Sequence, residues 1–442
     1  MDAKNQKVFT PTFISEVLGP PIRKGTSEGF ARIHTDSRNL APDDLFLPLK
    51  GEKFDGETFI PQALVAGVNA IISTTEIKEG NPSLWNWVVE DTLLAYRKLG
   101  AAWLKKINPK VFALGGSVGK TTTKDLLTLL LGPHTHSTQG SQNGFVGIPM
   151  TLLGLREDHT NLVLEVGIDE PGAMAQHCSL FTPHLATLTK ICEEHMETMK
   201  SLEKVIKEEM ILLNEAHKKG ALVFINGEDP HMVSHAEGLK GALVVGGKGE
   251  PVKIHQRELH YKGESYPFVL EGKTLAQNQA LAMAMALEAG CTPKDIKKRL
   301  LNFKPPQGRM NLHEQSGVLI LADYYNALPE AMGLALEILA EKSASRSGQR
   351  WLCLGDMLEL GEQEQSIHES LAAPIHEHQF EHVLLLGPRM NHLHQKLPRS
   401  QHFQNHEELA QSLKPKTGDT VLIKGSRGMR MEKIFEALHK EL

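Results

Sequence analysis

The chain has 442 residues, of which 40% are hydrophobic and 23% are charged, and its formal net charge is −5. These proportions are ordinary for globular proteins and exclude collagen-like, coiled-coil and disordered chains. A mildly negative chain has no general electrostatic attraction to nucleic acid or to an anionic membrane, so we expect neither as a partner. At roughly 150 residues per domain, the length favours about three domains.

The segment from Met1 to Phe13 has no apolar run of the length found in a signal peptide. No later stretch approaches the roughly 18 apolar residues of a transmembrane helix. We therefore expect a cytoplasmic protein without membrane insertion, and a monomer. The cysteines are far apart and form no Cys-x-x-Cys pair, so we predict neither a disulfide framework nor a zinc site.

The N-terminal part, residues 1–85, alternates short apolar runs with turn residues, as at Asp44 to Pro48. This pattern predicts a small α/β domain. From Asp91 to Ile107 the apolar residues are spaced as on one face of a helix, and Asn108-Pro109 ends the pattern. We interpret this helix as the start of a second domain.

After this helix, strand-like segments alternate with helical ones, which predicts mainly parallel sheets covered on both faces. The expected strands of the central domain, residues 86–312, are 111–114, 162–166, 185–189 and 221–226. Those of the C-terminal domain, residues 313–442, are 318–322, 350–354, 382–386 and 420–424. The predicted fold class is α/β in three domains, with a central P-loop ATPase-type parallel sheet and a C-terminal Rossmann-like doubly wound sheet.

A glycine-rich loop, Gly115-Gly116-Ser117-Val118-Gly119-Lys120-Thr121, joins the first central strand to a helical run. Glycines let backbone N–H groups approach a phosphate, and the helix N-terminus adds a favourable dipole. Lys120 can follow the β- and γ-phosphates, while the Thr121 hydroxyl can ligate Mg²⁺. The alternative is an ordinary glycine turn. The loop predicts ATP or GTP binding in a shortened form, because Leu114 stands where the usual pattern has its first glycine.

Extended to Lys124, this loop resembles the ATP loop of the Mur ligases. Further blocks match that family in order over nearly the whole chain: Asp36-Ser37-Arg38, Asp323 to Glu330, Leu354 to Gly361 and Lys424 to Met429. The resemblance implies a UDP-sugar-binding N-terminal domain, a central ATPase domain and a Rossmann-like C-terminal domain. It also implies an ATP-dependent activity that joins D-alanyl-D-alanine to UDP-N-acetylmuramoyl-tripeptide through an acyl phosphate, giving ADP and phosphate, in peptidoglycan precursor synthesis.

The resemblance also implies roles for individual residues. The ATP-binding residues would be Gly115, Gly116, Ser117, Val118, Gly119, Lys120, Thr121, Thr122, Asn278, Arg309, Asp323 and Asn326. The catalytic residues would be Lys120, Glu165, His195 and Glu209, and Mg²⁺ would be held by Thr121, Glu165 and His195. The substrate-binding residues would be Ser37, Arg38, Asn143, Lys424 and Ser426. For Asn278, Arg309, Asp323 and Asn326 the plainer alternative is a loop ion pair or a helix cap.

Glu209 stands where the Mur ligases usually carry a carbamylated lysine, which presents a carboxylate to a second Mg²⁺. A glutamate offers the same charge on a shorter stem. We hypothesise that Glu209 substitutes for the carbamate, directly or through a water, and so keeps two-metal chemistry. The alternative is a solvated helix carboxylate in the run Lys207-Glu208-Glu209.

Two other functions stay open. One is another amide ligase of the same superfamily, although the Asp-Asn-Pro-Arg motif expected of the diaminopimelate- or lysine-adding member is absent. The other is a non-catalytic ATP-binding paralogue. Glu209 and the family's asparagine-rich segment, where Ser141 and Gly144 replace amides, would then be signs of lost catalysis. The retention of Lys120 and His195 argues against that loss.

Overall fold

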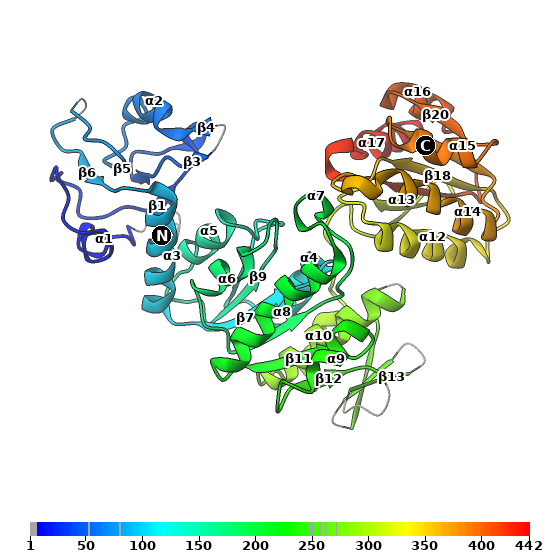
Figure 1. The fold of residues 1–442 in the computed structure, drawn as a ribbon, viewed down its shortest axis with the longest axis horizontal. Coiled ribbons are helices and arrows are strands. Elements are labelled where there is room, and N and C mark those ends of the chain that lie inside the picture. The colour runs from blue at the N-terminus through cyan, green and yellow to red at the C-terminus, as the bar shows by residue number, and fades with distance from the viewer. Residues whose placement is uncertain are drawn as a thin grey trace. The chain divides into compact units, whose positions relative to one another are not determined.

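The computed structural model describes residues 7–51, 54–78, 81–247, 252–255, 258–261, 263–270 and 272–442. These residues form a three-domain α/β fold with a four-stranded, a nine-stranded and a six-stranded sheet and a two-stranded ribbon (Figure 1). By its internal packing the chain divides into two units, one of which combines residues 1–110 with 138–162 and 176–182. The domain boundaries drawn from the sequence stay a prediction.

The four-stranded N-terminal sheet has the order β1-β2-β5-β6 and is parallel throughout. Its strands are β1 (Arg32–His34), β2 (Asp44–Phe46), β5 (Ala70–Ser73) and β6 (Trp85–Val88), and β3 (Lys50–Gly51) pairs separately with β4 (Phe54–Asp55). The helices are α1 (Pro11–Leu18), α2 (Ile60–Val65) and α3 (Thr92–Ile107). The prediction of α3 is confirmed: the Asp91 side chain caps its start by accepting a hydrogen bond from the Leu94 N–H, and Asn108 ends it in the left-handed conformation.

The nine-stranded sheet has the order β15-β14-β13-β12-β11-β10-β7-β9-β8. Its strands are β7 (Lys110–Gly115), β8 (Thr135–Ser137), β9 (Asn161–Glu165), β10 (Leu185–Leu188), β11 (Leu222–Asn226), β12 (Leu243–Val245), β13 (Val252–His255), β14 (Glu258–Tyr261) and β15 (Glu264–Pro267). The strands predicted for the central domain are confirmed, and β10 lies parallel to both β7 and β11. The antiparallel pairs of β14 with β13 and β15 were not predicted.

The helices between and after these strands are α4 (Lys120–Leu131), α5 (Gly147–Leu153), α6 (Ala173–Cys178), α7 (Met196–Met199), α8 (Leu202–Lys218), α9 (Pro230–Ala236), α10 (Lys273–Glu288) and α11 (Pro293–Leu300). Leu127 of α4 and Leu281 of α10 are fully buried in one core with Phe112 of β7. Two helices thus pack around the strand that leads into the glycine-rich loop.

The six-stranded C-terminal sheet has the order β16-β17-β21-β18-β19-β20. Its strands are β16 (Asn311–Gln315), β17 (Val318–Asp323), β18 (Arg350–Gly355), β19 (His382–Leu386), β20 (Gln401–Phe403) and β21 (Thr420–Lys424), and all but β16 are parallel. Its helices are α12 (Pro329–Ser343), α13 (Glu364–Ser370), α14 (Ala372–Glu377), α15 (Met390–Lys396), α16 (His406–Ser412) and α17 (Glu432–Glu441). The strands predicted for this domain are confirmed.

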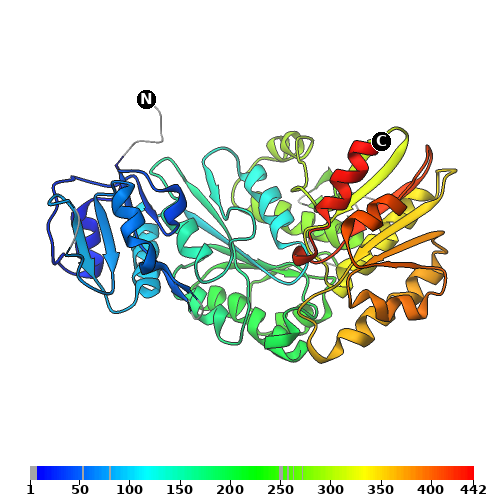
Figure 2. The ribbon, with the colours of Figure 1, turned by 90° about the horizontal axis from the view of Figure 1, so that it is seen from above.

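Both faces of this sheet are covered by helices (Figure 1), because alternate strand residues point to opposite sides. Leu352 and Leu354 belong to the core that α12 to α15 cover, whereas Trp351 and Cys353 belong to a second core with α16 and α17. Figure 2 shows α17, in red, beside the yellow strands, where the Phe435 ring lies 4.9 Å from the His313 ring. No helix in the described part of the chain is both long and apolar enough to span a membrane.

Candidate nucleotide-binding and catalytic site

The glycine-rich loop runs from the end of β7 to the first residue of α4, as predicted. Gly116 and Gly119 have φ values of 103° and 84°, which side chains rarely tolerate. A Cβ at Gly116 would lie 2.5 Å from Thr189 Oγ1, and one at Gly119 would lie 2.1 Å from Asn278 Nδ2. Both positions therefore require glycine.

Asn278 of α10 holds the loop from its other side. Its side chain is fully buried, and Nδ2 donates a hydrogen bond of 3.1 Å to the Val118 carbonyl oxygen. The resemblance implied that this residue binds ATP, and in the structure its side chain lies against the loop backbone. Asn278 thus fixes the shape of the loop that would receive the phosphates.

Gly119→Ala is expected to weaken ADP binding by about tenfold or more, because the loop must change shape to relieve both the φ strain and the contact with Asn278. Isothermal titration calorimetry with ADP measures this loss. The matched control is Gly220→Ala, where φ is +80° but no atom lies within 4 Å of the added Cβ. Equal ADP affinities for the two variants would contradict the prediction.

Lys120 lies among three buried carboxylates. Its Nζ donates hydrogen bonds to the Gly116 carbonyl oxygen and, over 3.3 Å, to Glu194 Oε2. Burial lowers the pKa of Lys120, but Glu194, Glu209 and Glu165 together raise it above its usual value. The ammonium group is therefore charged, as a phosphate-binding lysine must be. Glu194 was missed by the sequence analysis, although it directly precedes His195.

Glu209 and Glu165 both contact the loop. Glu209 is fully buried on α8, so the interpretation as a solvated carboxylate is wrong. Its Oε2 accepts a hydrogen bond of 2.9 Å from the Gly116 N–H, and burial raises the pKa of Glu209 to about 8. Glu165, the last residue of β9, accepts a hydrogen bond of 3.2 Å from Thr121 Oγ1.

The oxygen donors at this loop fit a magnesium ion. Thr121 and Glu165 already lie together, and Oε1 of both Glu194 and Glu209 is buried without a hydrogen-bond partner among the described residues. No three His, Cys, Asp or Glu side chains in that part of the chain form a complete metal site. Mg²⁺ usually takes one or two carboxylates and completes its shell with phosphate oxygens and waters.

The His195 side chain contacts a carboxylate of the C-terminal domain. Its Nδ1 lies 2.7 Å from Glu359 Oε2 of the C-terminal domain, and its Nε2 lies 3.9 Å from Asp169 Oδ1. The hydrogen bond to Glu359 raises the pKa of His195, although burial opposes it. The role of His195 as a metal ligand stays a prediction.

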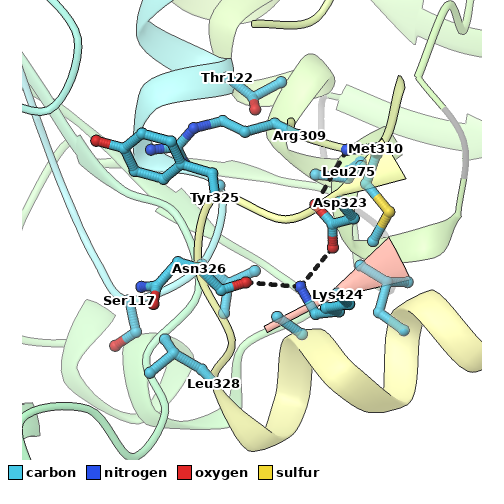
Figure 3. Close-up of a pocket in the computed structure, with 14 residues that line it drawn as sticks. Ser117, Thr122, Leu275, Arg309, Met310, Asp323, Tyr325, Asn326, Leu328 and Lys424 are labelled. Carbon is cyan, nitrogen blue, oxygen red and sulfur yellow. Dashed lines mark hydrogen bonds and ion pairs between the residues drawn. The ribbon is translucent and has the colours of Figure 1, made fainter. Parts of the chain in front are cut away.

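A pocket beside the loop is lined by Ser117 and Thr122 and by C-terminal residues (Figure 3). Asp323 at the end of β17 accepts a 3.0 Å hydrogen bond from the Met310 N–H and forms an ion pair with Lys424. Lys424 Nζ also donates to the Asn326 carbonyl oxygen over 2.8 Å. The predicted residues Asp323 and Asn326 thus line the same pocket. Asp323 also forms an ion pair with Lys424, as the alternative interpretation from the sequence expected.

The Arg309 guanidinium lies 4.0 Å from the centre of the Tyr325 ring (Figure 3), which forms a flat platform beside the same pocket. An adjoining cavity of about 480 Å³ shares Thr122, Leu275 and Arg309 with it. That volume lies within the range of about 300–1,000 Å³ typical of small-molecule sites. The sequence analysis did not single out Tyr325, although it stands between Asp323 and Asn326 in the matched block.

The residues assigned to substrate binding lie in several places. Lys424 is buried in the ion pair with Asp323, and Ser426 Oγ accepts a 2.9 Å hydrogen bond from the Leu358 N–H. Ser37 donates to Gln62, and the exposed Arg38 pairs with Asp36. Asn143 lies partly buried in the segment before α5. None of these roles is tested by the geometry, and each stays a prediction.

Three family models match successive parts of the chain. They are the Mur ligase family catalytic domain over residues 30–91, the Mur ligase middle domain over 114–287 and the Mur ligase glutamate ligase domain over 308–427. The UDP-N-acetylmuramoyl-tripeptide–D-alanyl-D-alanine ligase of Bacillus subtilis is 32% identical over 426 residues, which cover 92% of each chain. The chain belongs to the Mur ligase family.

Solved structures agree with this assignment. MurF from Acinetobacter baumannii is similar with a TM-score of 0.84 and 26% identity, covering 98% of this chain and 99% of that one. MurF ligase from Thermotoga maritima in complex with ADP is similar with a TM-score of 0.79 and 26% identity, covering 93% and 97%. Over its full length, the chain is therefore similar to one member of the family in particular.

Proposed function

We infer that the chain is the D-alanyl-D-alanine-adding ligase of peptidoglycan precursor synthesis, which joins this dipeptide to UDP-N-acetylmuramoyl-tripeptide with the conversion of ATP to ADP and phosphate. The full-length similarity to enzymes of that activity carries this conclusion. The glycine-rich loop and the pocket beside it would form the ATP site that the reaction needs.

We propose that the reaction proceeds through an acyl phosphate, because oxide is a poor leaving group. A carboxylate oxygen of the tripeptide attacks the γ-phosphorus and ADP leaves. The dipeptide amine then attacks the acyl carbon, phosphate leaves, and the amine loses a proton. Lys120 would neutralise the phosphate charge, and the N–H groups of the loop would orient the phosphates.

The Arg309–Tyr325 platform and Asp323 would receive the base and the ribose of ATP. The platform offers a flat face and the Asp323 carboxylate can accept hydrogen bonds from ribose hydroxyls. With the boundaries predicted from the sequence, Asp323 and Tyr325 come from the start of the C-terminal domain, whereas Arg309 and the phosphate loop belong to the central one. ATP would therefore contact both domains at once.

We also propose that Thr121 and Glu165 hold Mg²⁺, together with His195. The ion would neutralise the developing charge on the phosphate oxygens when it is bound. Glu209 would replace the carbamylated lysine of other family members. Its full burial, its position against Gly116 and its Oε1 without a hydrogen-bond partner among the described residues support that role.

One assay tests the function directly. The protein is incubated with ATP, Mg²⁺, D-alanyl-D-alanine and either the lysine- or the diaminopimelate-containing UDP-N-acetylmuramoyl-tripeptide. Phosphate release and product mass are followed together. We expect phosphate release with a mass gain of one dipeptide residue unit for at least one tripeptide. Phosphate release without that gain would refute the ligase assignment.

A further inference from the structure

Within the described ranges of the chain, the His195 ring has one side-chain hydrogen bond, and its partner is Glu359 of the C-terminal domain. Glu359 lies in the loop between β18 and the 3₁₀ turn η4 (Gly361–Gln363), within the block Leu354 to Gly361. The two atoms involved, Nδ1 and Oε2, are 2.7 Å apart. The ionised Glu359 carboxylate accepts this hydrogen bond, so Nδ1 carries a proton. When the ring is neutral, Nε2 therefore keeps its lone pair.

His195 and Glu359 both have unusual backbone conformations. His195 has φ of 49° and Glu359 has φ of 64°, conformations that residues other than glycine seldom adopt. Such conformations persist where the surroundings fix them, and they cluster at functional sites. Buried neighbours supply that fixation here: Met196 follows His195, and Leu360 follows Glu359. The backbone positions of His195 and Glu359 are thus fixed by their buried neighbours, although the Glu359 side chain itself is 58% exposed.

The two loops also approach each other closely at their backbones. A Cβ added to Gly361, whose φ is 61°, would lie 3.3 Å from the Met196 carbonyl oxygen. On the other side of the imidazole, Nε2 faces Asp169 Oδ1 at 3.9 Å. The ring therefore presents Nε2 toward the central domain, while the C-terminal domain holds Nδ1.

We propose that Glu359 is a positioning residue for His195: it fixes the tautomer in which Nε2 is free, and it thereby makes the metal-binding competence of His195 depend on the C-terminal domain. Carboxylates that hold the second nitrogen of a metal-binding histidine act in this way in many metal sites. This proposal rests on the metal role of His195 given under the proposed function. The proposal goes beyond that role by naming Glu359 as the residue through which the C-terminal domain controls a metal-binding residue of the central domain.

The test has a spectroscopic arm that needs neither metal nor turnover. Protein labelled with ¹⁵N-histidine is compared by NMR with Glu359→Ala, and the His195 signals are assigned from their loss in His195→Gln. We expect wild type to show a protonated Nδ1, and Glu359→Ala to show a mixture of tautomers. Glu359→Gln should keep the wild-type tautomer, because its amide oxygen still accepts the hydrogen bond.

The second arm measures Mn²⁺ binding to the ADP-bound protein by electron paramagnetic resonance. Glu359→Ala should lose about tenfold or more in Mn²⁺ affinity, the usual cost of removing such a partner, and Glu359→Gln should lose less. Glu362→Ala is the matched control, because Glu362 is an exposed carboxylate of the adjoining turn η4. It should bind Mn²⁺ as the wild type does.

A wild-type tautomer and wild-type Mn²⁺ affinity in Glu359→Ala would overturn the proposal, as would an equal loss in Glu362→Ala. Failure of the proposed function is recognised separately. It would show as a wild-type protein that makes no dipeptide adduct or binds no Mn²⁺ with ADP. The tautomer of His195 would still decide whether Glu359 positions it.

Discussion

Lys120→Ala is expected to lower the rate of ATP-dependent dipeptide addition by about 10³-fold. At ~4 Å and an effective dielectric constant of ~20, one opposing unit charge is worth roughly 4 kcal/mol, and each 1.4 kcal/mol or so is a factor of ten in rate. The loss should fall mainly on kcat, because charge on the transferring phosphoryl group is what the ammonium stabilises. Coupled phosphate release under saturating substrates measures it.

The control separates this effect from a loss of folding. Lys120 is the cation among Glu165, Glu194 and Glu209, so its removal leaves buried carboxylates without compensation. Thermal unfolding of Lys120→Ala and of Lys120→Arg shows whether both are folded at the assay temperature. Lys219→Ala, at an exposed position after α8, should have wild-type turnover. A folded Lys120→Ala within a few fold of wild type would disprove the role of Lys120.

Glu209→Gln is expected to reduce turnover by about 10²-fold at saturating Mg²⁺. The amide keeps the size of the side chain and can still accept the Gly116 N–H, so the loop should keep its shape. What it loses is the ability to become a negative charge beside a cation, because a bound cation would displace the proton that burial favours on Glu209. A charge role therefore predicts that Glu209→Gln is nearly as slow as Glu209→Ala, whereas a purely loop-bracing role predicts that Glu209→Gln stays fast.

Glu208→Gln is a closely matched control. Glu208 is the preceding residue of the same helix, it is also buried, and its Oε1 accepts a 2.8 Å hydrogen bond from a different backbone amide, that of Met174. Its variant should keep wild-type turnover if the effect at Glu209 belongs to the phosphate loop. A wild-type rate for Glu209→Ala would remove Glu209 from the catalytic machinery.

The strands of the central and C-terminal sheets could be predicted because their apolar runs are local signals. β7, its glycine loop and α4 are consecutive in sequence, so the strand, loop and helix of the proposed phosphate site could be recognised as a motif. The hairpin of β14 and β15 was missed, because each strand has only four residues and begins with a charged one, Glu258 or Glu264. Periodicity gives little signal in such segments.

The partners inside the site could not be predicted in the same way. Glu194 touches Lys120, and Glu359 touches His195, across 74 and 164 residues of sequence. Their contacts depend on which strands become neighbours and on loop conformations that carry no repeating pattern. Asn278 was found through the family resemblance, yet its hydrogen bond to Val118 was not, because a motif gives the residue type without the direction of its side chain.

The order of the C-terminal strands has a consequence for how the protein is made. β21 lies between β17 and β18, and its last residue, Lys424, forms an ion pair with Asp323, the last residue of β17, which stands 101 residues earlier. A chain emerging from the ribosome can pair β7, which leads into the glycine-rich loop, with β10 long before β21 has been synthesised. β17 and β18 can be joined in one sheet only after residues 420–424 have been synthesised. A nascent chain would therefore form the glycine-rich loop well before β21 stabilises the segment that carries Tyr325.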